Sequence, residues 1–349
     1  MTMTAATATD QLLAGEGKRK LVTIRQVESV SKHPNADRLE LIKIRNTGWT
    51  AVAAAGQYAV DSLVVMFEAG SVLPEQLAKT VGLPDGVTRI EPVKIRGIVS
   101  PVYICPASVL RMPESALRLA LDSGADLSAT LGVTKHIQPL PAEFTGDALP
   151  KDESLFSLGL VPVTDEVRLQ SEPWLREQVY SDPHGWQITQ KLDGTSATFA
   201  WYGKLHVCSR KLSLAEGNNI YWNYAKQHGL AEQLSTLPGN FAIQGELCGP
   251  GIRGNKLRLN EHKLFVFRVW DLNHNKPLNF SQARLVARMV GQSFVPVLHR
   301  YTSQVQLSLD ELVRIADQQA WFDLPAEGIV VSNYSYTSSF KVINSNFRD

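Results

Sequence analysis

A lysine and an aspartate two residues apart are the first residues in this chain whose types and spacing suggest chemistry. Lys191 and Asp193 stand in the tetrapeptide 191–194, directly after the strand-like run 186–190. Lysine is protonated at neutral pH, with a reference pKa near ~10.4, and it becomes a nucleophile only when burial or a neighbouring cation removes the proton. Side chains two residues apart share a face of an extended chain, so Asp193 can hold a metal-bound water beside the attacked group. We predict attack of Lys191 on a nucleotide α-phosphate; the alternative is an ordinary polar turn.

Three further charged residues recur beside strand-like runs downstream. Glu246 follows the run 241–245, Glu327 precedes a β-branched run, and Lys341 lies close to the C-terminus. Carboxylates at strand ends can approach a ribose hydroxyl or hydrated Mg²⁺, and a lysine can neutralise the charge that builds on an α-phosphate during transfer. Each residue alone is more simply a solvated surface charge. Their ordered recurrence favours one shared site.

Aromatic and glycine-rich segments give weaker signals. Phe265 and Phe267 share one face of the strand-like run 265–271, and Phe267 is the candidate for stacking on adenine, although both are equally well explained as core. The segment 249–254 matches Gly-x-Gly-x-x-Gly, but its second residue is proline and no helical pattern follows, so we reject a dinucleotide site. The eight histidines show no metal-ligand spacing.

The elements that must position these residues fall into two parts. The first part alternates apolar and polar residues in short runs separated by turns, which is typical of a small β-barrel that offers a strand face to oligonucleotides. Its basic and aromatic residues are candidates for contacting phosphates or stacking on a base, or else belong to the solvated face and the core; they are Lys43, Arg45, Lys94, Arg96, Trp49 and Tyr103. The second part alternates strands with helices, one predicted over 281–291 after Asn279 and one from the capping box Ser308–Glu311 to about residue 320.

Length and composition set the outer limits. A chain of 349 residues with 44% hydrophobic and 20% charged residues predicts about two globular domains. No apolar run approaches the ~18 residues of a membrane span, residues 1–17 lack a signal-peptide pattern, and three scattered cysteines predict no disulfides, which favours a cytoplasmic protein without membrane contact. Basic and acidic residues number 13 and 9 in 18–115, 5 and 11 in 116–190, and 17 and 12 in 191–349. Two mildly basic blocks flanking an acidic connector are compatible with binding of nucleic acid at two places.

The ordered motifs resemble those of the covalent nucleotidyltransferases, the polynucleotide ligases and mRNA capping enzymes. The segments 33–39 and 94–100 resemble OB-fold modules fused to tRNA-handling proteins. An OB-like module in front, with only eight residues after Lys341, is similar to the arrangement of the Naegleria-type and Deinococcus-type RNA ligases. Two departures are Ser196, where DNA ligases usually have arginine, and a single lysine at 341 where many ligases have Lys-x-Lys.

This resemblance implies an α+β fold, with an OB-like barrel followed by a nucleotidyltransferase domain of ATP-grasp-like antiparallel sheets plus helices. The expected boundaries are a disordered tail at 1–17, an OB-fold domain at 18–135, a linker at 136–155 and the nucleotidyltransferase domain at 156–349. Lys191 would be the nucleophile. Nucleotide binding would involve Arg168, Arg210, Glu246, Phe267, Glu327 and Lys341, and Asp193, Glu246 and Glu327 would organise a hydrated metal ion.

The implied activity is ATP-dependent joining of RNA 3′-hydroxyl and 5′-phosphate ends through lysyl-AMP and RNA-adenylate, in RNA repair or nick sealing. ATP and Mg²⁺ or Mn²⁺ are the expected cofactors, and a monomer is expected to act on RNA, with DNA as an alternative strand in a nicked duplex. The competing hypotheses are an inactive nucleotidyltransferase-like protein that binds nucleic acid, a tRNA-binding accessory protein, and a DNA-directed ligase.

Overall fold

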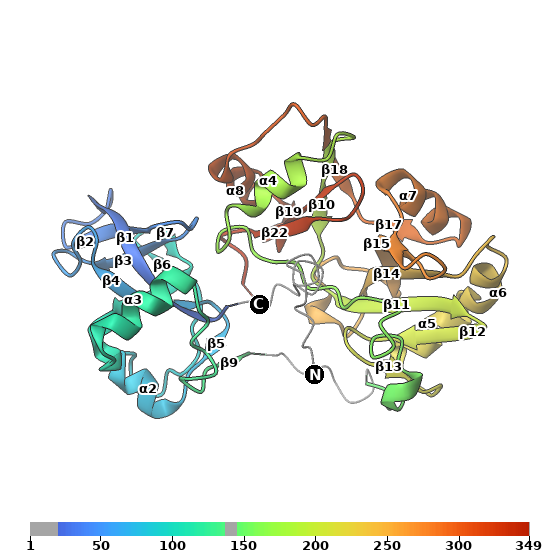
Figure 1. The fold of residues 1–349 in the computed structure, drawn as a ribbon, viewed down its shortest axis with the longest axis horizontal. Helices are drawn as coiled ribbons and strands as arrows, with labels where there is room; N and C mark the ends of the chain where they lie inside the picture. The colour runs from blue at the N-terminus through green and yellow to red at the C-terminus, as the bar shows by residue number, and fades with distance from the viewer. Residues whose placement is uncertain (1–19, 137–144, 349) are drawn as a thin grey trace, which may run out of the picture.

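The chain folds into two parts that lie side by side (Figure 1). The computed structural model describes residues 20–136 and 145–348, so the predicted tail at 1–17 and most of the first half of the predicted linker lie outside the described residues. The predicted domain boundaries stay predictions. No helix in the described segments has the length and apolar character that a membrane span needs.

The N-terminal part is a nearly closed five-stranded barrel, which confirms the predicted OB-like fold. Its sheet has the order β3-β2-β1-β4-β8, with each neighbouring pair antiparallel. Buried apolar side chains fill both faces of this curved sheet, because the strands alternate between an inner and an outer side. The barrel strands are β1 (Val22–Lys32), β2 (Leu39–Ile44), β3 (Thr50–Ala54), β4 (Leu63–Glu68) and β8 (Val102–Pro106).

Short elements complete this part. Two small antiparallel pairs, β5 with β9 and β6 with β7, lie at the edges of the barrel, and helix α3 packs on β1. These elements are β5 (Ser71–Val72), α2 (Glu75–Thr80), β6 (Val93–Ile95), β7 (Ile98–Ser100), the 3-10 turn Ala107–Leu110, α3 (Glu114–Ser123) and β9 (Thr134–Lys135).

The C-terminal part is built from two antiparallel sheets and their covering helices. The first has the order β18-β10-β21-β22, and helices α4 and α8 pack on β21 and β22 around Trp186 and Phe340. Its elements are α4 (Leu175–Tyr180), β10 (Trp186–Lys191), β18 (Val297–Tyr301), α8 (Leu309–Asp317), β21 (Gly328–Asn333) and β22 (Ser339–Ile343), with the small pair β19 (Ala320–Trp321) and β20 (Leu324–Pro325). The short 3-10 helix η3 (Lys151–Glu153) lies against the second sheet, where the nearby Leu155 packs on Ala200 and Cys208.

The second sheet has the order β13-β12-β11-β14-β15-β16, with β17 pairing in parallel with β15. Helices α5, α6 and α7 cover it around a large apolar core. Its elements are β11 (Thr195–Tyr202), β12 (Lys204–Cys208), β13 (Ser213–Leu214), α5 (Ile220–Gln227), α6 (Leu230–Ser235), β14 (Phe241–Cys248), η4 (Arg253–Asn255), β15 (Lys263–Asp271), β16 (Lys276–Pro277), α7 (Phe280–Met289) and β17 (Ser293–Phe294). Since β10 and β11 belong to different sheets, the link 192–194 crosses from one to the other.

Both helices predicted from start signals are present. The Asn279 side chain accepts a hydrogen bond from the backbone of Gln282, and Ser308 and Glu311 form a reciprocal capping box. The helices end two or three residues earlier than predicted, α7 at Met289 and α8 at Asp317. The glycine at 291 follows α7 with a positive φ of 64°, which most residues avoid and which stops the helix.

The two parts contact each other through the segment that follows the linker. The backbone N–H of Gly48 donates to the carbonyl of Gln170 at 2.7 Å, and the Trp49 indole N–H donates to the Ser171 hydroxyl at 3.3 Å. Trp49 is 5% exposed, which favours the second of its two predicted roles, a core residue, over stacking on a base; it packs at the domain interface. Tyr103 packs half-buried against the barrel core and its hydroxyl donates to the carbonyl of Val81 at 2.6 Å.

Candidate active site

The ends of β10 and β21 place the predicted nucleophile, Lys191, beside the carboxylate of Glu327. Lys191 pairs with Gly328 in the strand register, which places Glu327 next to the lysine, and Lys191 Nζ lies 2.7 Å from Glu327 Oε2. Glu246 comes from the other sheet, on β14, and Asp193 lies in the crossing between the sheets. Residues separated by more than a hundred positions thus surround one ammonium group.

Two glycines allow this close approach of strands. A Cβ at Gly194 would lie 2.5 Å from the Leu247 carbonyl oxygen and 2.9 Å from Glu246 Cγ, and the Gly194 N–H donates to Glu246 Oε1 at 3.1 Å. Gly328 has φ +140°, and a Cβ there would lie 2.1 Å from the Val342 carbonyl oxygen. Glycine is therefore required beside each acid, because any side chain would push the carboxylates away from Lys191.

The surrounding carboxylates keep the Lys191 ammonium group protonated. Burial acts to lower the pKa of Lys191, but the negative charges of Glu327, Glu246 and Asp193 outweigh it and raise this pKa above its ordinary value. Burial also raises the pKa of Glu246 to about 7, with a further contribution from Glu327. Burial and Glu327 raise the pKa of Asp193. The carboxylates crowd each other and keep the lysine charged.

A second charged group lies around Lys341 on the neighbouring strand β22. Lys341 Nζ donates to Asp165 Oδ1 at 3.3 Å, and Arg210 forms an ion pair with Asp165 Oδ2 at 2.6 Å. Arg168 lies beside Lys341, since the backbone of the two residues forms a parallel β-bridge. Burial, together with the charges of Lys191 and Arg168, lowers the pKa of Lys341 to about 8 although Asp165 acts to raise it.

Asp165 is a site residue that the motif order did not reveal. In the segment before Lys191, only Arg168 was expected to act. Asp165 joins Lys341 and Arg210, so it fixes two of the cations predicted to meet the nucleotide. The sequence gives no local signal for this role, because Asp165 and Lys341 are 176 positions apart.

The remaining site residues lie around this centre. Lys256 Nζ is 2.7 Å from Asp193 Oδ2, which gives this carboxylate a partner of its own. Phe267 is half-buried and packs in a small apolar cluster with Leu192 and Cys248, next to the crossing between the sheets. The glycine-rich segment 249–254 leads into a 3-10 turn rather than a helix, in agreement with our rejection of a dinucleotide motif.

Asp193, Glu246 and Glu327 are the residues of this site that could hold a hydrated metal ion. Asp193, Glu246 and Glu327 all act on Lys191, yet no group of three His, Cys, Asp or Glu side chains in residues 20–136 and 145–348 is arranged to ligate a metal directly. Mg²⁺ keeps several of its waters and commonly contacts proteins through them. Three carboxylates around one buried ammonium group suit such an ion.

Comparisons with known proteins agree with this geometry. The RNA ligase family model matches residues 184–343, which contain the whole Lys191 centre, and an OB-fold domain model matches residues 21–107. The Naegleria gruberi RNA ligase, as a mutant with ATP and Mn, is 26% identical, with a TM-score of 0.77 over 93% of this chain and 97% of that one. The same ligase with PPi is 26% identical with a TM-score of 0.76 over the same shares.

The curated relatives match shorter stretches. The phenylalanine–tRNA ligase β subunit of Chromobacterium violaceum is 32% identical over 144 residues, which are 40% of this chain and 15% of that protein. YtpR of Bacillus subtilis, whose name proposes tRNA binding, is 33% identical over 91 residues, 26% of this chain and 40% of that protein. The chain thus spans less than half the length of these two relatives. On the matched models and the near-complete structural likeness, the chain belongs to the RNA ligase family, a family of ATP-dependent ligases, and carries an OB-fold domain ahead of its ligase domain.

Proposed function

We propose that this protein joins 3′-hydroxyl and 5′-phosphate ends of RNA, using ATP, by way of an enzyme-lysyl-AMP and an RNA-adenylate. The observation that carries the proposal is the environment of Lys191, a half-buried lysine enclosed by Glu327, Glu246 and Asp193. A lysine held among carboxylates that a cation can neutralise is one whose nucleophilicity depends on the bound ligand.

The first step is attack of Lys191 Nζ on the α-phosphorus of ATP. An N–P bond forms, the bond to the leaving oxygen breaks, and pyrophosphate departs. Lys191 must first lose the proton that the carboxylates retain in the ligand-free site. A hydrated Mg²⁺ or Mn²⁺ held by Asp193, Glu246 and Glu327 would neutralise that negative charge and lower the pKa of the lysine.

The second charged group suits the phosphate. Lys341 and Arg210 are held by one carboxylate, Asp165, so they present two cations where charge builds during transfer. Arg168 beside Lys341 adds a third, and Phe267 offers an aromatic face near the crossing between the sheets for adenine.

Two further displacements complete the reaction. The 5′-phosphate of RNA takes AMP from Lys191, and an RNA 3′-hydroxyl then attacks this phosphate and releases AMP. Both steps require in-line geometry and charge neutralisation more than a strong base, which this cation-rich site can supply. RNA repair or nick sealing by a cytoplasmic monomer is the setting that this reaction and the N-terminal OB fold favour.

The decisive test is covalent labelling with α-labelled ATP and Mg²⁺ after pyrophosphate has stripped any bound AMP. We expect an acid-labile label on the wild type and on Lys276→Ala, an exposed lysine of the same domain, and none on Lys191→Ala. A folded wild type without label would contradict the proposal and favour an inactive protein that binds nucleic acid.

A second comparison separates RNA from DNA ligation. A nicked duplex whose 3′-hydroxyl strand ends in ribose should be sealed faster than an otherwise identical duplex whose 3′-hydroxyl strand ends in deoxyribose. Equal or faster sealing of the deoxyribose end would support the DNA-directed alternative.

A further inference from the structure

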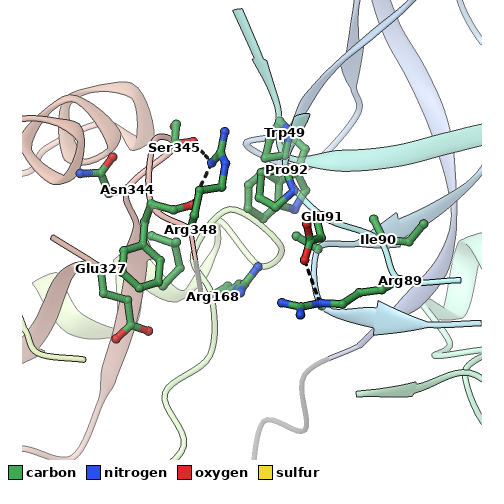
Figure 2. A pocket seen from close by; sticks show the side chains of 15 residues that line it. Trp49, Arg89, Ile90, Glu91, Pro92, Arg168, Glu327, Asn344, Ser345 and Arg348 are labelled. Carbon is green, nitrogen blue, oxygen red and sulfur yellow. Dashed lines mark hydrogen bonds and ion pairs between the residues drawn. The ribbon is translucent and has the colours of Figure 1, made fainter. Parts of the chain in front are cut away.

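A small pocket lies between the OB-fold domain and the ligase domain, beside the catalytic centre (Figure 2). Charged side chains from both domains line it, and arginines are prominent among them, so the group that it would take is an anion. The OB-fold domain contributes Arg89 and Glu91, and the ligase domain contributes Arg168, Glu327 and Arg348.

Arginines from three separate segments line this pocket. The Arg89 guanidinium is 30% exposed and lies 3.2 Å from Glu91, whose side chain is 58% exposed. Arg168 NH1 lies 3.7 Å from the buried Glu68 of the OB-fold domain. Arg348 donates to the backbone carbonyls of two residues close to it in sequence, at 3.2 Å and 2.8 Å. Neither of these two hydrogen bonds is to a carboxylate.

The acidic residues of the pocket leave it open to an anion. Glu327 is engaged by Lys191 at 2.7 Å, so its charge is directed to the catalytic lysine. Glu91 is the acid facing Arg89, and as an exposed partner it can swing into solvent at little cost, since exposed ion pairs contribute about 0–1 kcal/mol. A phosphate can replace Glu91 on Arg89 with a bidentate contact.

The pocket is physically tied to the nucleophile. Lys256 Nζ donates to Asp193 Oδ2 at 2.7 Å and to the carbonyl oxygen of Arg348 at 3.1 Å, and it lies 4.1 Å from the centre of the Phe347 ring. Two residues of the pocket wall, Phe347 and Arg348, therefore contact the lysine that holds a carboxylate of the catalytic centre. A phosphate in this pocket would lie within the reach of one RNA strand that also presents its end to Lys191.

We infer that this pocket binds a backbone phosphate of the RNA substrate through Arg89 and Arg348, and so lets the OB-fold domain place the strand for joining. The inference rests on the proposed function and adds a substrate subsite that spans both domains. The pocket chemistry is that of a phosphate, which ATP also carries. RNA is favoured because the OB-fold domain supplies one of the two arginines, and OB folds bind oligonucleotides.

Binding of a nicked RNA duplex, followed by fluorescence anisotropy over a series of salt concentrations, tests the inference. Arg89→Ala and Arg348→Ala should each weaken binding about fivefold to tenfold and reduce the slope of log affinity against log salt by about 1. Arg118→Ala is the matched control, because Arg118 is an OB-fold arginine that is also paired with a surface glutamate, Glu114. It should leave affinity and slope near wild type.

Glu91→Gln gives the opposite expectation. Removing the carboxylate that competes for Arg89 should tighten RNA binding about twofold to fivefold without changing the fold of the pocket. Arg89 and Arg348 variants that bind RNA with wild-type affinity and slope would overturn the inference.

Formation of lysyl-AMP over a series of ATP concentrations is the second arm, and it distinguishes the two phosphate sources. Retention of labelling by the Arg89 and Arg348 variants, with weakened RNA binding, supports the RNA assignment and shows that the variants are folded. A shifted ATP requirement with unchanged RNA affinity would give the pocket to ATP and overturn the RNA assignment. Absence of lysyl-AMP in the wild type would remove the proposed function alone, because the RNA-binding arm would still report on the pocket.

Discussion

Two lysines of one sheet, the half-buried Lys191 and the buried Lys341, have pKa values shifted in opposite directions. Lys191 on β10 and Lys341 on β22 flank the same strand, β21, and each has a carboxylate partner, at 2.7 Å and 3.3 Å. Burial acts to lower the pKa of both. Lys191 nevertheless has its pKa raised, whereas Lys341 has its pKa lowered to about 8.

The difference comes from the neighbours rather than from burial. Three carboxylates act on Lys191, while Lys341 shares Asp165 with Arg210 and also faces Lys191 and Arg168. A cation bound among the carboxylates would reverse the setting of Lys191, and a bound phosphate would reverse that of Lys341. The surroundings of Lys191 thus suit a bound cation, and those of Lys341 suit a bound phosphate.

Replacing each lysine with methionine, a neutral side chain of similar length, tests whether the two lysines have different roles. Lys191→Met should abolish lysyl-AMP formation, since no other group supplies the N–P bond. The labelled band on a denaturing gel is the measurement. Residual label above background would mean that a second nucleophile exists.

Lys341→Met should keep the nucleophile and lose charge neutralisation. We expect the rate of lysyl-AMP formation in a single turnover to fall about 10²–10³-fold, the range observed when one preorganised group that stabilises developing charge is removed. Lys341→Arg, which keeps the charge, should recover part of the rate. A fall confined to the ATP concentration required, with no change in the maximal rate, would show that Lys341 only binds ATP.

Asp165→Asn should lower the rate less than Lys341→Met does, because it changes the pKa of Lys341 and leaves the lysine in place. Loss of the carboxylate removes the charge that raises the pKa of Lys341, so this pKa should fall below about 8. Lys341 must be protonated to neutralise phosphate, so the high-pH limb of kcat/KM for ATP should move to lower pH and the rate at pH 8 should drop about tenfold. An unmoved limb would assign it to another group.

Local signals explain how much of this molecule could be predicted from its sequence. The strand runs and the start of α8 at Ser308 follow from alternation and capping, which act over a few residues. Spacing and order also identified Lys191 and its acids, although their roles stay predictions. The pairing of Asp165 with Lys341 joins residues 176 positions apart, and burial of Trp49 depends on docking of two domains. Neither leaves a local pattern.

The last expected effect concerns stability rather than rate, and it has opposite signs at the two ends of the site. Glu246 has a folded-state pKa of about 7, above its ordinary value near ~4.3, so its contribution is present at low pH and is lost as pH rises through about 7. Lys341 has a folded-state pKa of about 8, below its ordinary value, so its contribution is present at high pH and is lost as pH falls through about 8.

Glu246→Gln should therefore flatten the dependence of the free energy of unfolding on pH between about 4.5 and 7, and Lys341→Met should flatten it above about 8. Each change should amount to no more than about 3.5 kcal/mol, because each pKa lies about 2.5 units from its ordinary value and one pKa unit corresponds to ~1.4 kcal/mol. Urea unfolding across this range is the measurement, and Glu261→Gln, an exposed acid, is the control. If both variants kept the wild-type slope, the pKa values of Glu246 and Lys341 would be the same in the folded and the unfolded chain. The opposite electrostatic effects at the two ends of the site would then be contradicted.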